Sequence, residues 1–384
     1  MSVSLTKRTP VRSVASVVFV VLLAQLLAVI YVCFLMQRYP VYVIQAGVQF
    51  DYFEFYKSAH QVLHGINPYE GGRMFMPPSS IVTGFLLCWL PWGTAAWAFF
   101  VLNFLVLLLA LKRLADVFTL SDTNRLLLYG IALIYFPVLF LLQRGNLDGI
   151  MLALIVFAMT TQNRVLRGIL LGLSLAMKLY SGLFLVLLAA KRKWGVIATS
   201  VAVFFVMQAP FYRIFVSFVE ALTGRAYKFK VAENISPSSL VDLVNPTAYQ
   251  LEYLFYVAWA LLLVIRIKRD VATPLSKSWP LYLPWMFTFP SLVFPYTGVL
   301  GLGLLAYIIS QSQRRRLYTS EFVVVVGFLL LGFQGTAWSA MMHLLIENTL
   351  VMYQVCALGS LVMLIGATFM PAPGGGAEPA AKSV

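Results

Sequence analysis

The sequence contains few charged residues. Only 11% of its 384 residues are Asp, Glu, Lys or Arg, whereas charged residues make up about a quarter of an ordinary soluble domain. Hydrophobic residues make up 61% and recur along the whole chain, which leaves no room for an independent soluble domain. The composition therefore excludes a water-soluble protein and indicates an integral membrane protein.

Cysteine and histidine are also scarce, with three residues of each. Cys33, Cys88 and Cys356 all lie inside apolar segments, at spacings that suit neither a disulfide nor a metal site. His60 and His64 are four residues apart, but the sequence shows no third ligand beside them. We therefore expect no metal and no other cofactor.

The alternation of apolar and polar residues that marks membrane β-strands is absent. Instead, apolar runs such as VASVVFVVLLAQLLAVIYVCFL are continuous and long enough to cross about 30 Å of hydrocarbon as helices. We expect an all-α polytopic membrane protein with one transmembrane domain over residues 1–384. Its bundle should contain about 12 transmembrane helices, and the first, residues 14–36, should be retained rather than cleaved as a signal peptide.

The positive charge predicts which loops face the cytoplasm. The formal net charge of +14 comes from short Lys and Arg clusters between apolar runs, which indicates cytoplasmic loops and not a nucleic-acid partner. The clusters lie at residues 7–12, 112–125, 164–167, 191–193, 266–269 and 314–316. On the extracytoplasmic side we expect two large loops, residues 37–78 and 213–249. Residues 371–384 should form a disordered cytoplasmic tail.

Two apolar segments are expected to contain broken helices. A single crossing over residues 168–194 would place the basic cluster 191–193 outside, so we predict two half-length helices that meet near Lys178 and Tyr180. The same arrangement fits residues 279–311, with FPSLVFPYTG as the outer turn. Short helices of this kind can line a wet cavity.

The first outer loop contains a candidate functional carboxylate. Its sequence QFDYFEFYKSAHQVLHGINPY predicts an amphipathic interfacial helix with Phe50, Phe53 and Tyr56 on the membrane surface. Asp51 and Glu54 face elsewhere on that helix. Two interpretations stay open. The helix only lies on the membrane, or Asp51 sits at the rim of a cavity between helices.

Two cations lie at the ends of apolar segments. Arg144 belongs to the motif QRGNLDG, which we expect at the outer tip of a helical hairpin. In the same motif, Asn146 and Asp148 are either ordinary helix caps or binding residues. Lys178 lies inside an apolar run, where a charge costs about 2.5–3.5 kcal/mol on insertion scales. It is either an anchor that reaches the membrane surface or a contact for a phosphate.

Taken in order, these motifs resemble glycosyltransferase family 87. The first-loop signature of that family is similar to Asp51 and Tyr56 followed by HGINPY (64–69) and FMPPSS (75–80). Its later elements are similar to QRGNLDGIM (143–151), to the stretch 168–194 and to NISPSSL (234–240). The sequence departs from the family pattern at Met76, at Arg144 and in residues 289–298, which carry no histidine.

The resemblance implies a GT-C fold and a membrane glycosyltransferase. Such an enzyme transfers a sugar, with mannose favoured, from a polyprenyl-phosphate donor to a lipid or glycan acceptor, and it inverts the anomeric carbon. The reaction is expected at the extracytoplasmic face of the cytoplasmic membrane, without a metal. The family pattern makes Asp51 the general base.

The chemistry of that reaction predicts the other site residues. The leaving lipid phosphate needs cationic donors, which Arg144 and Lys178 can supply. Further candidates for substrate binding are Glu54, Tyr56, Asn67, Tyr69, Asn146, Asp148, Tyr180 and Asn234. The alternative function is a lipid-linked-sugar flippase or a secondary transporter, which the lack of an internal repeat in the sequence disfavours.

Overall fold

The computed structural model describes residues 49–70, 76–225, 249–270, 272–288, 295–315, 317–332 and 349–371, and every described element is helical. The α-helices are α3 (Phe50–Leu63), α4 (Val82–Phe85), α5 (Trp92–Val117), α6 (Asp122–Ile134), α7 (Phe136–Arg144), α8 (Asp148–Thr160), α9 (Arg164–Met177), α10 (Leu183–Ala190), α11 (Trp194–Gln208), α12 (Tyr212–Arg225), α14 (Tyr249–Arg269), α15 (Leu275–Ser278), α16 (Leu283–Thr288), α17 (Gly301–Arg314), α18 (Thr319–Gly332) and α20 (Thr349–Phe369). Short 3₁₀ helices span Pro78–Ile81, Leu179–Gly182, Ala209–Phe211, Trp279–Tyr282 and Pro295–Leu300. The expected helical class is confirmed.

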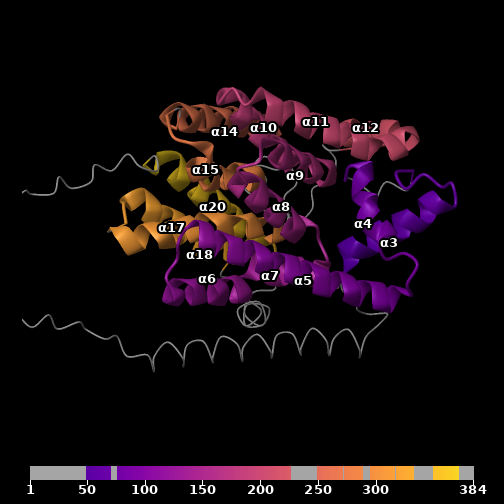
Figure 1. Ribbon diagram of the computed structural model, residues 1–384, viewed down its shortest axis with the longest axis horizontal. Coiled ribbons are helices and arrows are strands. Elements are labelled where there is room, and N and C mark those ends of the chain that lie inside the picture. The colour runs from indigo at the N-terminus through magenta and orange to yellow at the C-terminus, as the bar shows by residue number, and fades with distance from the viewer. Residues whose placement is uncertain are drawn as a thin grey trace, which may run out of the picture.

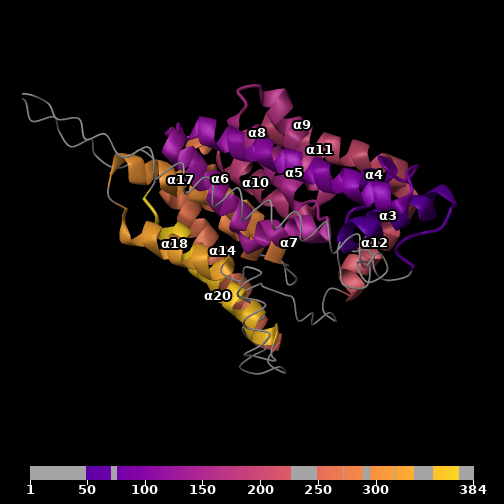
Figure 2. The same ribbon diagram turned by 90° about the horizontal axis from the view of Figure 1, so that it is seen from below.

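The helices are arranged along one long axis. In Figure 1, α3, α4 and α12 lie toward one end of that axis and α6 and α17 toward the other. Figure 2 shows the same separation after the quarter turn. The long helix α5 begins beside α3 and reaches the helices α6 and α17 at the far end. The molecule therefore has two ends, and the site and the basic loops can be assigned to one or the other.

Two described helices are long and apolar enough to cross a membrane, namely Trp92–Val117 with 26 residues and Trp194–Glu220 with 27. A bent pair, Asp122–Leu133 with Pro137–Arg144, adds a third if it counts as one crossing. The described part of the chain thus has transmembrane candidates, in agreement with the expected membrane protein. The count of about 12 crossings stays a prediction, and its first helix, residues 14–36, lies outside the described residues.

The first segment that was expected to be broken, residues 168–194, is broken. α9 ends at Met177, Lys178 has an extended backbone, and a 3₁₀ turn leads into α10. The chain reverses there, because residues at the start of α9 and at the end of α10 line one cavity. The second segment comprises α16 and α17 with their 3₁₀ turns, and part of its expected outer turn, residues 289–294, lies outside the described residues.

The segment 213–249 is not a loop along its whole length. α11 continues through the 3₁₀ helix Ala209–Phe211 into α12, so that residues up to Arg225 are helical. The apolar segment Trp194–Glu220 counts as one candidate crossing, which is longer than the crossing expected over residues 194–212. Residues 226–248, including Asn234, lie outside the described residues, as does the expected tail beyond residue 371.

The first-loop helix α3 exists, but the face expected to lie on the membrane is in part inside the protein. Phe53 and Tyr56 contact the Trp92 ring, with ring centroids 4.9 Å and 5.3 Å away. Tyr52 and Phe55 are buried in a cluster formed by α3, α5 and α12, and the described residues do not include the Phe50 side chain. Packing against the aromatic start of α5 therefore decides the orientation of α3.

Two glycines bring α9 and α11 into close contact. A Cβ atom at Gly168 would lie 2.5 Å from the Thr199 Cβ atom, and one at Gly172 would lie 2.6 Å from the Ser200 carbonyl oxygen. Small residues four apart allow two helix backbones to approach in this way. This contact fixes the end of α9, from which Lys178 projects.

Candidate functional site

The tip of the hairpin between α7 and α8 is built by a glycine. Gly145 ends α7 with a left-handed backbone, φ 65°, and its N–H donates to the Leu141 carbonyl at 2.9 Å. A Cβ atom at this position would collide with the side chains of Gln49 and Tyr52. Glycine therefore allows both the turn and the approach of α3, which brings Asp51 to the hairpin.

Asp51 is held by two residues of this hairpin. Its Oδ1 atom lies 2.9 Å from Arg144 Nη2 and 3.1 Å from Arg144 Nε. Its Oδ2 atom accepts a hydrogen bond from Asn146 Nδ2. The structure thus unites a carboxylate of the first loop with a cation and an amide that lie more than ninety residues later.

Lys178 joins this group through Asn146 and is paired with a second carboxylate. Its Nζ atom lies 2.6 Å from Asn146 Oδ1 and 2.7 Å from Asp148 Oδ1. Tyr180 also donates to Asp148 Oδ1, and Thr297 donates to Asp148 Oδ2 at 2.8 Å. Tyr180 and Thr297, each in a 3₁₀ turn, therefore bind the same Asp148 carboxylate. We call the set Asp51, Arg144, Asn146, Asp148, Lys178, Tyr180 and Thr297 the polar network.

The charges of the polar network balance and are nearly buried. The exposed fractions of the side chains are 15% for Arg144, 9% for Asp51, 9% for Lys178 and none for Asp148. An isolated charge in such a place costs several kcal/mol, whereas paired and hydrogen-bonded charges are tolerated. Two cations facing two carboxylates balance the formal charge of the site inside a largely apolar protein.

Two of the open interpretations are now decided. Lys178 is not an anchor that reaches the membrane surface, because its ammonium group is buried against Asp148. Asp148 does not cap α8, since its carboxylate binds Lys178, Tyr180 and Thr297. Asn146 accepts the Asp148 N–H at 3.3 Å, but Leu147 holds the cap position of α8.

The other first-loop candidates lie outside the polar network. Glu54 is half-buried on α3 and has no contact with the network among the described residues. The Tyr56 hydroxyl donates to the Leu90 carbonyl at 2.9 Å, which fastens α3 to the chain just before α5. Glu54 and Tyr56 were both predicted as substrate contacts, and for Glu54 this stays a prediction. The hydrogen bond of Tyr56 gives it a role in packing.

The segment after α3 is fastened to α12. Asn67 Nδ2 donates to Ser217 Oγ at 2.9 Å, and the Tyr69 hydroxyl donates to the Met76 carbonyl. These contacts hold the NPY part of the first-loop motif in place, which leaves substrate binding by Asn67 and Tyr69 a prediction. Asn234 lies outside the described residues.

Three members of the site were missed by the sequence reasoning. Gln49 Nε2 donates to the Leu142 carbonyl at 2.6 Å, and Asn103 Nδ2 donates to the Asn146 carbonyl at 2.7 Å, so both hold the hairpin tip. Thr297 contacts Asp148. Asn103 carried a usable signal, because a polar side chain within an apolar helix needs a buried partner. Thr297, in a turn, carried none.

The site can therefore accept a proton and can offer positive charge a few ångströms away. Among the described residues, Arg144 and Asn146 use three of the about four lone-pair positions of the Asp51 carboxylate. One position is left for a donor such as a substrate hydroxyl. A hydroxyl that donates there can lose its proton as it attacks. The nearby guanidinium and ammonium groups suit a phosphate.

Comparisons with known proteins point to a glycosyltransferase. The profile of glycosyltransferase family 87 matches residues 75–330, which include every member of the polar network except Asp51. No curated protein sequence matches the chain. The crystal structure of ArnT from Cupriavidus metallidurans in the apo state is similar with 16% sequence identity and a TM-score of 0.37, over 77% of this chain and 67% of that one. A similarity this distant carries no argument about the site.

Proposed function

Because the chain belongs to glycosyltransferase family 87, we propose that it transfers a sugar from a polyprenyl-phosphate donor to a lipid or glycan acceptor. Mannose is the favoured sugar, and the transfer inverts the anomeric carbon. The fold is proposed to be of the GT-C type. The observation that carries this proposal is the Asp51 carboxylate, held between Arg144 and Asn146 and still 9% exposed.

Asp51 is proposed to act as the general base. The acceptor hydroxyl donates to its carboxylate, and the proton moves to Asp51 as the hydroxyl oxygen attacks the anomeric carbon. The bond from that carbon to the phosphate oxygen breaks, and the lipid phosphate leaves with the electron pair. Arg144 supports this role, because its two contacts hold the carboxylate in one orientation.

Arg144 and Lys178 are proposed to stabilise the leaving phosphate. Arg144 contacts Asp51 directly, and Lys178 reaches the same carboxylate through Asn146, so both cations lie within one side chain of the base. Positive charge that is fixed before the reaction stabilises charge that develops in the transition state. Arg144, the more exposed of the two, is the better placed to touch the donor.

A panel of polyprenyl-phosphate sugars tests this function. The purified protein, incubated with one donor at a time and candidate lipid acceptors, should consume one donor and add one sugar mass to an acceptor. We expect the mannose donor to react, and mass spectrometry of the lipid extract measures both changes. The outcome that favours a transporter is different. The protein, reconstituted in vesicles, would then move a donor between the leaflets and consume none of the donors in the panel.

The polar network is proposed to face the extracytoplasmic side of the cytoplasmic membrane. Contacts between the basic clusters support this orientation. Arg113 donates to Thr160 at 3.0 Å and Arg314 donates to Thr119 at 3.4 Å, so the cluster 112–125 and Arg314 lie at the same end of the described helices. Asp148 and Thr160 are the opposite ends of α8, which places the network about 18 Å from that end.

Single cysteines test the orientation in intact cells. In a background without Cys33, Cys88 and Cys356, cysteines at the exposed positions Ile66 and Glu70 should react with an impermeant thiol reagent, and those at Thr123 and Gln313 should react only after the cells are opened. Ser58 and Asn146 are buried and would report poorly. Labelling of Thr123→Cys but not Ile66→Cys in intact cells would reverse the orientation and rule out an outer-leaflet donor.

A further inference from the structure

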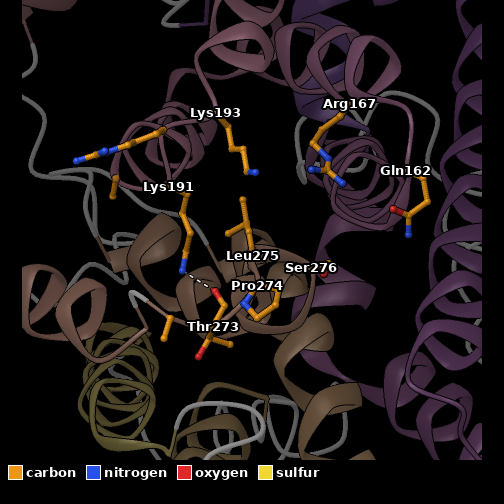
Figure 3. A pocket seen from close by; sticks show the side chains of 11 residues that line it. Gln162, Arg167, Lys191, Lys193, Thr273, Pro274, Leu275 and Ser276 are labelled. Atoms are coloured by element: carbon orange, nitrogen blue, oxygen red, sulfur yellow. Dashed lines mark hydrogen bonds between the residues drawn. The ribbon is translucent and has the colours of Figure 1, made fainter.

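A polar cavity lies away from the polar network. Its volume is about 540 Å³, and its walls come from Gln162, Arg167 and residues 190–193 and 272–276. Four of the lining residues, Arg167, Lys191, Arg192 and Lys193, are cations, and none of the described lining residues is acidic. Figure 3 shows Arg167, in α9, and Lys193, in the turn before α11, pointing toward the space between them.

The turn between α10 and α11 builds one wall of this basic cavity. Arg192 has a left-handed backbone, φ 54°, and the N–H groups of residues 192 and 193 bond to carbonyls in the last turn of α10. The turn places Lys193 at the start of α11, where no side chain caps the helix. The partial positive charge of a helix start adds to that of Lys193.

The opposite wall is built by Arg167. Asn163 caps α9 by accepting the N–H groups of Val165 and Leu166 at 2.9 Å and 3.1 Å, which begins the helix one turn before Arg167. The Arg167 guanidinium donates to the Thr161 carbonyl at 2.6 Å at the end of α8. Its partners are neutral, so its charge is not cancelled by a carboxylate.

Lys191 closes the floor of the cavity, where its ammonium group is held by backbone carbonyls. Its ammonium group donates to the Thr273 carbonyl at 2.5 Å, as the dashed line in Figure 3 marks. The nearby Asp270 carboxylate is held by Arg266, with a distance of 2.9 Å between Arg266 Nε and Asp270 Oδ2. Burial lowers the pKa of Lys191, and Asp270 offsets this only in part. An anion in the cavity would therefore relieve an existing cost.

Two exposed apolar residues are close in sequence to cations that line the cavity. Trp194 is 62% exposed beside Lys193, and Val165 is 59% exposed beside Arg167. Exposed apolar side chains next to a charged pocket suit a ligand with a charged head and hydrocarbon chains. A tryptophan at such a boundary is typical of the membrane interface.

The position of the cavity separates it from the proposed reaction. α9 carries Lys178 at its end and Arg167 in its first turn, and α10 runs from the Tyr180 turn to Lys191. Arg167 and Lys178 are 11 residues apart, and so are Tyr180 and Lys191, which corresponds to about 17 Å of α-helix, so the cavity lies at the opposite end of these helices. A donor phosphate held at the polar network cannot also reach it.

We propose that the basic cavity binds the phosphate head group of an anionic membrane lipid. The head group sits between Lys193 and Arg167, and its acyl chains lie along the exposed apolar surface next to Trp194 and Val165. Basic pockets between membrane helices bind anionic head groups in this way. This site is independent of sugar transfer and would fasten the turns after α8 and α10 to one leaflet.

Titration with short-chain phosphatidylglycerol tests the proposal. The full chain is purified in a neutral detergent, and its thermal unfolding midpoint is followed, because a ligand that binds the folded state raises this midpoint. The double variant Arg192→Gln/Lys193→Gln should bind the lipid about tenfold more weakly or worse. Its midpoint without lipid checks folding, and Lys193→Gln alone serves as the milder variant.

The matched control also removes two positive charges, but from residues that do not line the cavity. Lys112 and Lys268 are exposed and do not line it, so Lys112→Gln/Lys268→Gln should bind the lipid like the wild type. Equal losses in both double variants would mean that overall charge attracts the lipid, and the site would be wrong. Equal binding of short-chain phosphatidylcholine, competition by inorganic phosphate at matched concentration, or no binding by the wild type would each overturn the assignment to an anionic lipid.

Discussion

Asp51→Asn should lower the rate of sugar transfer by about 10²–10⁴-fold, the usual contribution of a general base. The amide keeps the shape of the side chain, and its oxygen can still accept from Arg144, but an NH₂ group replaces the oxygen that accepts from Asn146, and the side chain cannot take the proton of the acceptor hydroxyl. Transfer to a lipid acceptor from the donor found in the panel measures the rate. The unfolding midpoint of the variant shows whether the protein is intact.

Glu54→Gln is the matched control for this substitution. Glu54 lies three residues further along α3, and the exchange again turns a carboxylate into an amide, but Glu54 has no contact with the polar network among the described residues. Its rate should stay close to that of the wild type. If folded Asp51→Asn keeps transfer within about tenfold, or ~1.4 kcal/mol of barrier, another group is the base.

Lys178→Met should destabilise the protein by about 3–5 kcal/mol, because it leaves the fully buried Asp148 carboxylate without its cation. Asp148→Asn should cost a similar amount by leaving Lys178 unpaired. The double variant Lys178→Met/Asp148→Asn should recover part of this loss, since no charge is then left alone. Thermal unfolding midpoints in a neutral detergent rank the stabilities of the wild type, the two single variants and the double variant.

The ion pair between Arg125 and Asp116 provides the comparison. Its atoms lie 2.8 Å apart, but the side chains are 34% and 40% exposed, so Arg125→Gln should cost no more than about 1 kcal/mol. A Lys178→Met protein as stable as Arg125→Gln, or a double variant less stable than either single one, would show that Lys178 and Asp148 are not paired. Because the assay reads stability, it separates the pairing from any role of Lys178 in donor binding.

Sequence alone determined the helical class of the protein and the break near Lys178. Apolar runs must form helices in a membrane, since no water is present to satisfy the backbone. The break at Lys178 followed from the basic cluster 191–193, which has to lie on the same side of the membrane as the basic cluster 164–167. Local signals of this kind depend on residues close together in the chain, so they can be found without a fold.

Sequence also marked most of the polar network, because charged side chains in apolar surroundings are costly and need a reason. Lys178 was recognised in this way, whereas Asp51 was indicated by its place in the first outer loop and Arg144 by its place at the end of an apolar segment. Their resemblance to the family motifs gave the same residues a chemical role, and the family profile later matched the region that contains two of them.

Only the tertiary structure decided which of these residues are partners. Arg144 pairs with Asp51 across 93 residues, Lys178 pairs with Asp148, and Thr297 reaches Asp148 across 149 residues. The orientation of α3 was likewise decided by packing against Trp92 and not by its own pattern. Contacts at such separations depend on how whole helices pack, and the sequence around any one residue does not encode its distant partner.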